Sequence, residues 1–168
     1  MTITDPAALR QILQEATILY LALHAEPAPY VVPVCFGVQG DLLYLHGGTS
    51  GRKLELLRAD PRVGFSACTE VAIRRGTDAC AFTASARSVV GTGRARIVED
   101  EGERMRGLDA IMRHYHPGWE AARAGDEGSG RARYRGGPLS RTCVIAVHVE
   151  TLSGKRTGPA REAPSATA

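Results

Sequence analysis

The feature that most constrains the fold is the shortness of the turns between successive apolar runs near the N-terminus. Residues 18–23, 30–36 and 42–46 are rich in Ile, Leu, Val and Tyr, as β-strands are. Only the Pro-rich residues 26–29 and the Gly-containing residues 39–41 mark the turns between them. A parallel connection needs a crossover of about a dozen residues or more, which these gaps cannot supply. The runs therefore predict an antiparallel sheet built from hairpins.

The rest of the chain adds further strands and a few short helices. We predict helices over 5–16, 50–58 and 100–115, strands over 62–68, 87–98 and 143–149, a loop or weak extension over 69–80, and a loop over 120–137. Many antiparallel strands with few helices indicate an α+β fold, mainly antiparallel β, in the form of a barrel. Residues 1–157 form one domain in this interpretation, and residues 158–168 form a disordered tail.

Composition and charge argue against several classes of function. The net charge is +3 and the basic residues are scattered, which argues against nucleic-acid binding. No apolar run approaches the roughly 20 residues of a membrane helix, and the N-terminus lacks the pattern of a secretory signal. We therefore expect a cytoplasmic protein that does not bind a membrane.

The four cysteines give no sign of a metal site. Cys35, Cys68, Cys80 and Cys143 form no C-x-x-C pair, and no His stands at zinc-finger spacing from them. Cys35 and Cys143 lie in apolar runs, where we expect reduced, buried thiols. The sequence thus predicts no metal.

Pro33 interrupts the second apolar run. Proline has no N–H to donate to a sheet ladder, so this strand must lie at an edge or break there. A broken edge leaves backbone groups free to bond a ligand. The glycines within residues 87–98 likewise suggest a bulge or a close backbone approach.

Residues 46–53, His-Gly-Gly-Thr-Ser-Gly-Arg-Lys, form the strongest local signal. Glycines let the backbone approach an anion, and the hydroxyls and the start of the following helix supply donors. Arg52 and Lys53 add full charges. Lys53 and Lys155 are the only lysines among 21 basic residues, and an ammonium is a compact charge suited to a phosphate oxygen. The segment predicts a phosphate cradle; the alternative is a Gly-rich turn with solvated charges.

Five segments in order resemble a known family. They are 30–34 (YVVPV), 43–47 (LYLHG), 50–54 (SGRKL), 60–63 (DPRV) and 87–95 (RSVVGTGRA). Together they resemble the pyridoxamine-phosphate-oxidase-like superfamily of FMN-binding split β-barrels. Within it, they look most like the branch of 5-nitroimidazole reductases, which confer nitroimidazole resistance.

The resemblance implies a homodimer with FMN at its interface. Arg52 and Lys53 would hold the phosphate, assisted by Thr49 and Ser50. The other residues that the resemblance implies at the cofactor are Pro33 and Val34 (backbone against the flavin ring), His46 (near the flavin), Gly47, Ser88 (near the phosphate) and Lys155 (near the dimer interface).

The same resemblance implies a flavoprotein oxidoreductase, in which the flavin does the redox work and the protein positions it. It would reduce nitroaromatic or other small electron-poor substrates, and His46 is the best match for a catalytic histidine. Residues 83–86 are Thr-Ala-Ser-Ala where the family has larger side chains, which alters the pocket.

Two alternatives stay open at this point. One is a flavin- or haem-binding protein without turnover, with His116 as a haem ligand; the other is a deazaflavin-dependent reductase. His114 and His116 at a helix end also suit the helix dipole without any ligand. Trp119, the only tryptophan, is predicted to pack a loop onto the barrel or onto a partner subunit.

Overall fold

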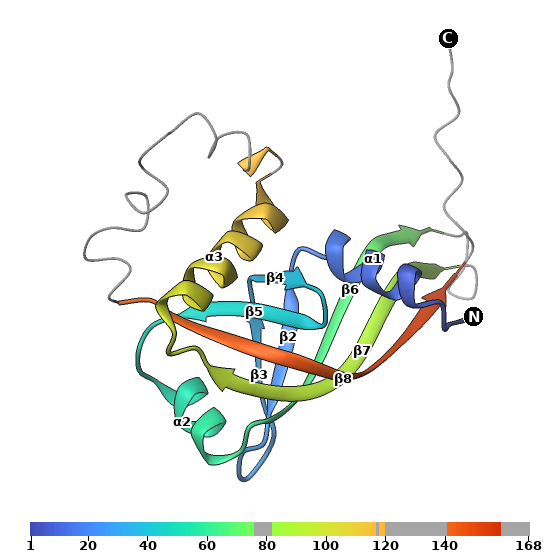
Figure 1. Cartoon of the computed structure of the whole chain (residues 1–168). Coiled ribbons are helices and arrows are strands. Elements are labelled where there is room, and N and C mark those ends of the chain that lie inside the picture. The colour runs from blue at the N-terminus through green and yellow to red at the C-terminus, as the bar shows by residue number, and fades with distance from the viewer. Residues whose placement is uncertain (76–81, 117, 120–140, 159–168) are drawn as a thin grey trace.

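The structure is a computed structural model that describes residues 1–75, 82–116, 118–119 and 141–158. The predictions for residues 120–137, for residues 159–168 and for Cys80 lie outside these residues. The elements are β1 (Thr2–Ile3), α1 (Pro6–Glu15), β2 (Leu19–Leu23), β3 (Tyr30–Val34), β4 (Phe36–Gln39), β5 (Leu42–Gly47), α2 (Arg52–Ala59), β6 (Arg62–Arg74), β7 (Thr83–Ile97), α3 (Glu101–Tyr115) and β8 (Cys143–Thr157) (Figure 1).

The strands form one antiparallel sheet whose two edges are neighbours in sequence. The strand order is β3-β2-β6-β7-β8-β5-β4, with β1 added to β8. Since β3 ends at Val34 and β4 begins at Phe36, a single residue joins the two edge strands. The sheet must curve round until its edges meet, yet β3 and β4 are not paired. The α+β, mainly antiparallel prediction is confirmed, as an open, split barrel.

Pro33 was predicted to place its strand at an edge or to break it there, and the first of these is confirmed. Pro33 lies on the edge strand β3, opposite Tyr20 of β2. The run predicted as one strand over 30–36 is also broken, at Cys35, between β3 and β4. This break leaves Cys35 exposed, so the prediction of a buried thiol was wrong there, whereas Cys143 is buried as predicted.

Two strands are longer than the sequence suggested. β6 continues through residues 69–74, where a loop or weak extension was predicted, because it pairs with β7 as far as Arg74 opposite Thr83. β8 continues to Thr157 because it pairs with β7 as far as Thr157, which lies opposite Ala86. The glycines of β7 predicted a bulge, and a register shift between β7 and β8 occurs between Thr92 and Gly93.

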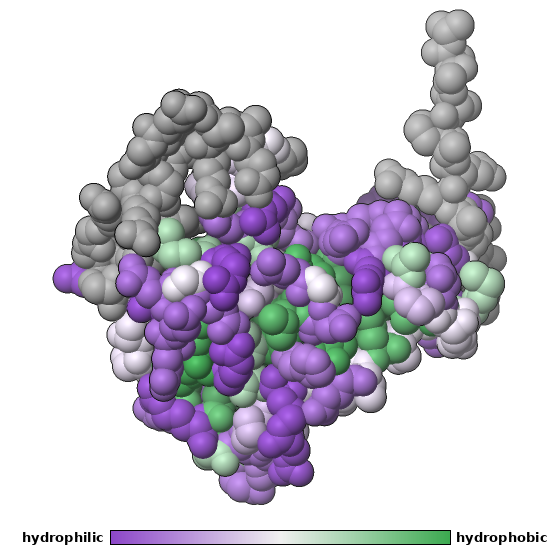
Figure 2. Space-filling model, in the orientation of Figure 1, coloured by the Kyte–Doolittle hydropathy of each residue, from purple (hydrophilic) through white to green (hydrophobic). Residues whose placement is uncertain are grey.

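The helices cover the sheet from two sides. α1 buries Leu9, Ile12 and Leu13 in the main core inside the curved sheet. α3 packs outside, against β4 and β5, in a second apolar cluster. At Gly37 of β4 the α3 backbone approaches so closely that a Cβ would lie 2.3 Å from the carbonyl carbon of Ala110. Figure 2 shows that hydrophobic residues also reach the surface in the middle of the face turned to the viewer.

Candidate functional site

The loop from β5 to α2 ends in a helix start with no side-chain cap. α1 and α3 begin at Asp5 and Asp100, whose carboxylates accept from the N–H of Ala8 and Glu103. α2 instead begins after Gly51, at a φ of 112° that favours glycine, and no side chain caps it. The N–H groups of Leu54 and Glu55 donate to the carbonyl oxygen of Gly51, which leaves those of Arg52 and Lys53 as the donors that the helix start offers to an anion.

Lys53 folds back over the end of β5. Its Nζ lies 3.1 Å from the place that a Cβ at Gly47 would take, so glycine makes room for the ammonium there. The side chain is half-buried, and burial lowers the pKa of Lys53. Among the described residues, no carboxylate forms an ion pair with it. A half-buried cation without a counter-ion favours an anionic ligand.

His46 and Cys143 stand beside this ammonium. Register pairs Gly47 of β5 with Cys143 of β8, and His46 with Val144. Burial, and then the charge of Lys53, lower the pKa of His46. Burial raises the pKa of Cys143, with a smaller opposing effect from Lys53. The sequence did not point to Cys143, because only strand pairing brings it here.

Arg52 points away from Lys53, toward β3. Its guanidinium carbon lies 4.9 Å from the ring centroid of Tyr30, in a cation–π contact. Tyr30 begins the strand that carries Pro33, which is exposed, and Val34, which is buried.

Thr49 and Ser50 are exposed in the loop between β5 and α2. The segment was predicted as one phosphate cradle. In the structure its two basic side chains point in different directions, Lys53 toward β5 and Arg52 toward β3.

Ser88 and Lys155 lie elsewhere in the same chain. They face each other across β7 and β8, and Ser88 Oγ donates to the carbonyl oxygen of Lys155 over 3.5 Å. Lys155 stands twelve residues beyond Cys143 on β8, or about 40 Å along a strand. One chain does not bring these two residues to the Lys53 cluster.

Exposed apolar side chains share one face of the sheet with Ser88. Tyr20 is paired with Ser66 of β6, which is paired with Val90 of β7. Tyr20 is 49% exposed and Val90 57% exposed. Ser88 is two residues from Val90 and therefore points to the same side. We call this surface, defined by Tyr20, Ser66, Ser88 and Val90, the outer face.

His114 and Tyr115 at the end of α3 form hydrogen bonds with the backbone of the segments packed against it. His114 Nε2 lies 2.8 Å from the carbonyl oxygen of Ala16. The Tyr115 hydroxyl donates to the carbonyl of Thr17 over 2.7 Å and accepts from the N–H of Phe36 over 3.1 Å. Burial is the main cause that raises the pKa of Tyr115 to about 12.

Trp119 is buried beside the same helix. Its indole Nε1 donates to Asp109 of α3 over 3.2 Å. Its ring centroid also lies 6.0 Å from that of His116, which is exposed. In the described part of the chain, no helix combines the length and the hydropathy needed to cross a membrane.

Known proteins resemble this chain in sequence and in fold. The family described as pyridoxamine 5'-phosphate oxidase matches residues 5–156. A candidate 5-nitroimidazole antibiotic resistance protein from Bacteroides thetaiotaomicron is 28% identical with a TM-score of 0.72, covering 94% of this chain and 87% of that chain. No curated protein matches the chain.

Two further solved structures share the fold at lower identity. A flavocytochrome from Azotobacter vinelandii is 23% identical with a TM-score of 0.73, covering 97% of this chain and 72% of that chain. An FAD and haem binding protein from Mycobacterium smegmatis is 22% identical with a TM-score of 0.74, covering 96% and 76%.

Proposed function

The chain belongs to the pyridoxamine 5'-phosphate oxidase family, and on this premise we propose that it is an FMN-dependent oxidoreductase. Structures of the same fold that are described as binding FAD and haem support a redox cofactor. When bound, the flavin would supply the redox chemistry, while the protein holds and orients it.

The observation that carries this proposal is the half-buried ammonium of Lys53, which forms no ion pair among the residues that the structure describes. It lies over Gly47, beside the uncapped start of α2. Arg52 adds a second cation at the same helix start, and Thr49 and Ser50 add hydroxyls. This donor set fits a phosphate group, since backbone N–H groups, hydroxyls and an ammonium all donate to its oxygens. It favours FMN, whose single phosphate needs one such cradle.

We propose that the active form is a homodimer with the cofactor at the interface. Ser88 and Lys155 are separated from Lys53 within one chain, and they share the outer face with exposed Tyr20 and Val90. A second copy seated on that face would bring its own Ser88 and Lys155 toward the first copy's cradle.

His46 is the residue we propose for catalysis. Its lowered pKa keeps the ring neutral at neutral pH, so that one ring nitrogen can accept a proton while the other donates one. The reaction we propose is reduction of a small electron-poor acceptor such as a nitroaromatic compound. The likeness to the candidate nitroimidazole resistance protein supports this substrate class.

The test compares FMN with riboflavin, which has the same ring system and no phosphate. The purified protein is titrated with each ligand while its visible spectrum and the flavin fluorescence are recorded. We expect FMN to bind at least tenfold more tightly, a difference of about 1.4 kcal/mol. Equal affinities would place the phosphate away from Lys53, and the absence of binding by either ligand would refute the proposal.

A further inference from the structure

Arg52 is a cation of the proposed cradle that contacts an aromatic ring and not a carboxylate. Among the described residues it forms no ion pair, not even with Glu55, which stands three residues further along α2. Its guanidinium carbon lies 4.9 Å from the ring centroid of Tyr30. A carboxylate would occupy N–H donors of the guanidinium, whereas the ring attracts its positive charge. The contact therefore restrains Arg52 while its donors stay available to a ligand.

The ring of Tyr30 is itself held in place by the core. Tyr30 is paired with Leu23 of β2, which is buried, and its partly buried side chain packs against the main core. Tyr20 of the outer face is paired with Pro33, and side chains alternate along a strand, so Tyr30 points to the opposite side of the sheet. A second copy seated on the outer face would therefore leave the contact between Arg52 and Tyr30 in place.

The packing of α2 fixes the direction in which its first side chains leave the helix. Leu54 and Leu57 are buried, which sets the face that the helix turns to the core. Consecutive residues of an α-helix are about 100° apart around its axis. Arg52 and Lys53 consequently leave the first turn in different directions, toward β3 and toward β5.

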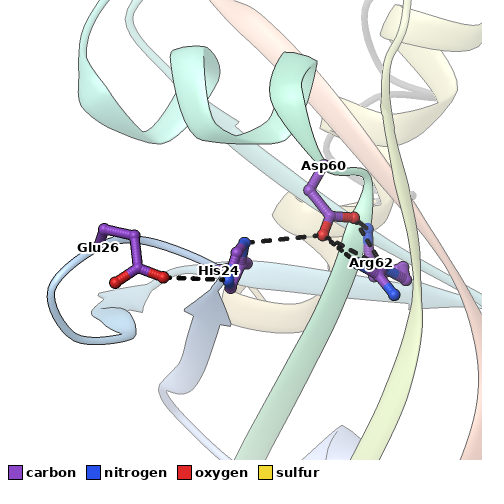
Figure 3. Close-up of polar contacts among 4 residues, drawn as sticks. All are labelled: His24, Glu26, Asp60 and Arg62. Atoms are coloured by element: carbon purple, nitrogen blue, oxygen red, sulfur yellow. Dashed lines mark hydrogen bonds and ion pairs between the residues drawn. The ribbon is translucent and has the colours of Figure 1, made fainter.

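The C-terminal end of α2 is held by a separate set of charged groups. Asp60 follows the helix and accepts hydrogen bonds from Nε and Nη2 of Arg62, over 3.0 and 2.7 Å, which hold the pKa of Asp60 well below its ordinary value. His24, which follows β2, lies 4.0 Å from Asp60 and 3.9 Å from Glu26 (Figure 3). Both ends of α2 thus meet the β2–β3 hairpin, the first at Tyr30 and the last at His24.

We propose that Tyr30 is a positioning residue of the FMN site, which holds Arg52 on the β3 side so that Arg52 and Lys53 approach the phosphate from two directions. This inference rests on the proposed function. A guanidinium that is already restrained on a ring loses less conformational freedom when it binds a phosphate than a freely moving side chain does. It is also kept apart from the Lys53 ammonium, which reduces the repulsion between the two cations before the anion binds.

The test measures the ratio of FMN affinity to riboflavin affinity by fluorescence titration, because only FMN carries the phosphate. Tyr30→Leu removes the ring, and the ratio should fall about threefold, as expected when the cation–π contact of an exposed arginine is lost. Tyr30→Phe keeps the ring, so this variant should retain the ratio of the unaltered protein. The affinity for riboflavin should be the same in all three proteins.

Two comparisons separate positioning of Arg52 from a general effect on the fold. Tyr30→Leu should lower the ratio in the unaltered chain but not in Arg52→Ala, where no guanidinium is left for the ring to hold. His24→Gln removes the contact at the other end of α2 and should leave the ratio unchanged. Urea unfolding checks that each variant is folded, and Tyr30→Met replaces Tyr30→Leu if the latter is not.

Four results would overturn the positioning role. They are an unchanged ratio on loss of the ring, an equal fall of the ratio in Tyr30→Phe, a further fall when Tyr30→Leu is added to Arg52→Ala, and an equal fall in His24→Gln. If the unaltered protein distinguishes FMN from riboflavin in such a case, the phosphate cradle stands and only the role of Tyr30 is refuted. Equal affinities of the unaltered protein for the two flavins would refute the cradle, and the role of Tyr30 with it.

Discussion

Lys53 loses part of its hydration on burial and gains no carboxylate partner within the described part of the chain, so an anion bound beside it would offset that cost. In the double variant Arg52→Ala, Lys53→Ala, FMN affinity should fall at least tenfold, by about 1.4 kcal/mol, in a fluorescence titration. Riboflavin affinity should stay the same, because no phosphate is involved. Arg106→Ala, an exposed cation on α3, serves as the control. A double variant that loses both ligands equally would contradict a role at the phosphate.

The pKa of His46 depends in part on the charge of the Lys53 ammonium. Because burial and then Lys53 disfavour the charged ring, the free energy of unfolding should decrease as the pH falls below about 6.5, where the unfolded state takes up a proton more readily. Lys53→Met should raise the pKa of His46, measured from its ring proton shifts in an NMR pH titration. Burial remains in this variant, so the pKa should stay below its ordinary value. A pKa that does not move would show that the charge of Lys53 does not act on His46.

At the scale of single residues, the sequence predicted the part of the candidate site whose residues are close together in the chain. His46, Gly47 and Lys53 are close in sequence, so a Gly-rich loop followed by basic residues was enough to predict that they gather. Cys143 joins them only through the pairing of β5 with β8, for which no local signal exists.

The ends of β6, β7 and β8 are held together by a buried arginine. Arg87 is 7% exposed and donates to Glu70 over 2.8 Å, and Arg156 of β8 donates to the same carboxylate over 3.4 Å. Glu70 sits at a bulge with a φ of 52°, which is unfavourable for a residue other than glycine. The network therefore fixes the strand ends that carry Ser88 and Lys155 on the opposite side of the sheet.

Arg87→Met should destabilise the fold by about 3 kcal/mol, because it leaves Glu70 without its buried partner. The measurement is urea unfolding followed by circular dichroism. Arg10→Met breaks the exposed pair between Arg10 and Asp41, at 3.0 Å, and should cost much less because water screens both charges. If both variants lowered the free energy of unfolding by the same amount, the burial of Arg87 would not add to the stability that its ion pair provides.

The element boundaries show where local patterns stop being informative. α1 and α3 have clear caps and apolar faces, and their predicted ranges match the structure within about two residues. Residues 69–74 were predicted as a loop or weak extension although Val71 and Ile73 stand at alternate positions, and they extend β6 because β7 provides a partner. The same pairing, and not composition, extends β8 to Thr157.

For the whole molecule, the sequence predicted the α+β barrel but not how it is split. The short turns between the first apolar runs were enough to predict hairpins. The positions of β3 and β4 at opposite edges of one sheet depend instead on the order of all the strands. Pro33 indicated an edge, and the edge exists because β3 has a partner on one side only. The resemblance to the family supplied what the local patterns could not.

The exposed apolar side chains of the outer face give the homodimer a direct test. Tyr20 and Val90 are about half exposed although they are large and apolar, and Ser66 lies between them in register. A charged side chain there would have to be buried without a partner in the dimer, which is costly. Val90→Arg should therefore convert the dimer to a monomer in size-exclusion chromatography with light scattering, while the melting temperature of the chain changes little.

The same variant links assembly to the cofactor. If Ser88 and Lys155 of the second copy complete the FMN site, the monomeric Val90→Arg variant should bind FMN at least tenfold more weakly at protein concentrations where the unaltered chain is a dimer. Arg106→Ala, exposed on α3 and away from the outer face, should change neither property. A monomer that binds FMN with full affinity would show that one chain holds the whole site, and that Lys53 needs no second copy to capture the phosphate.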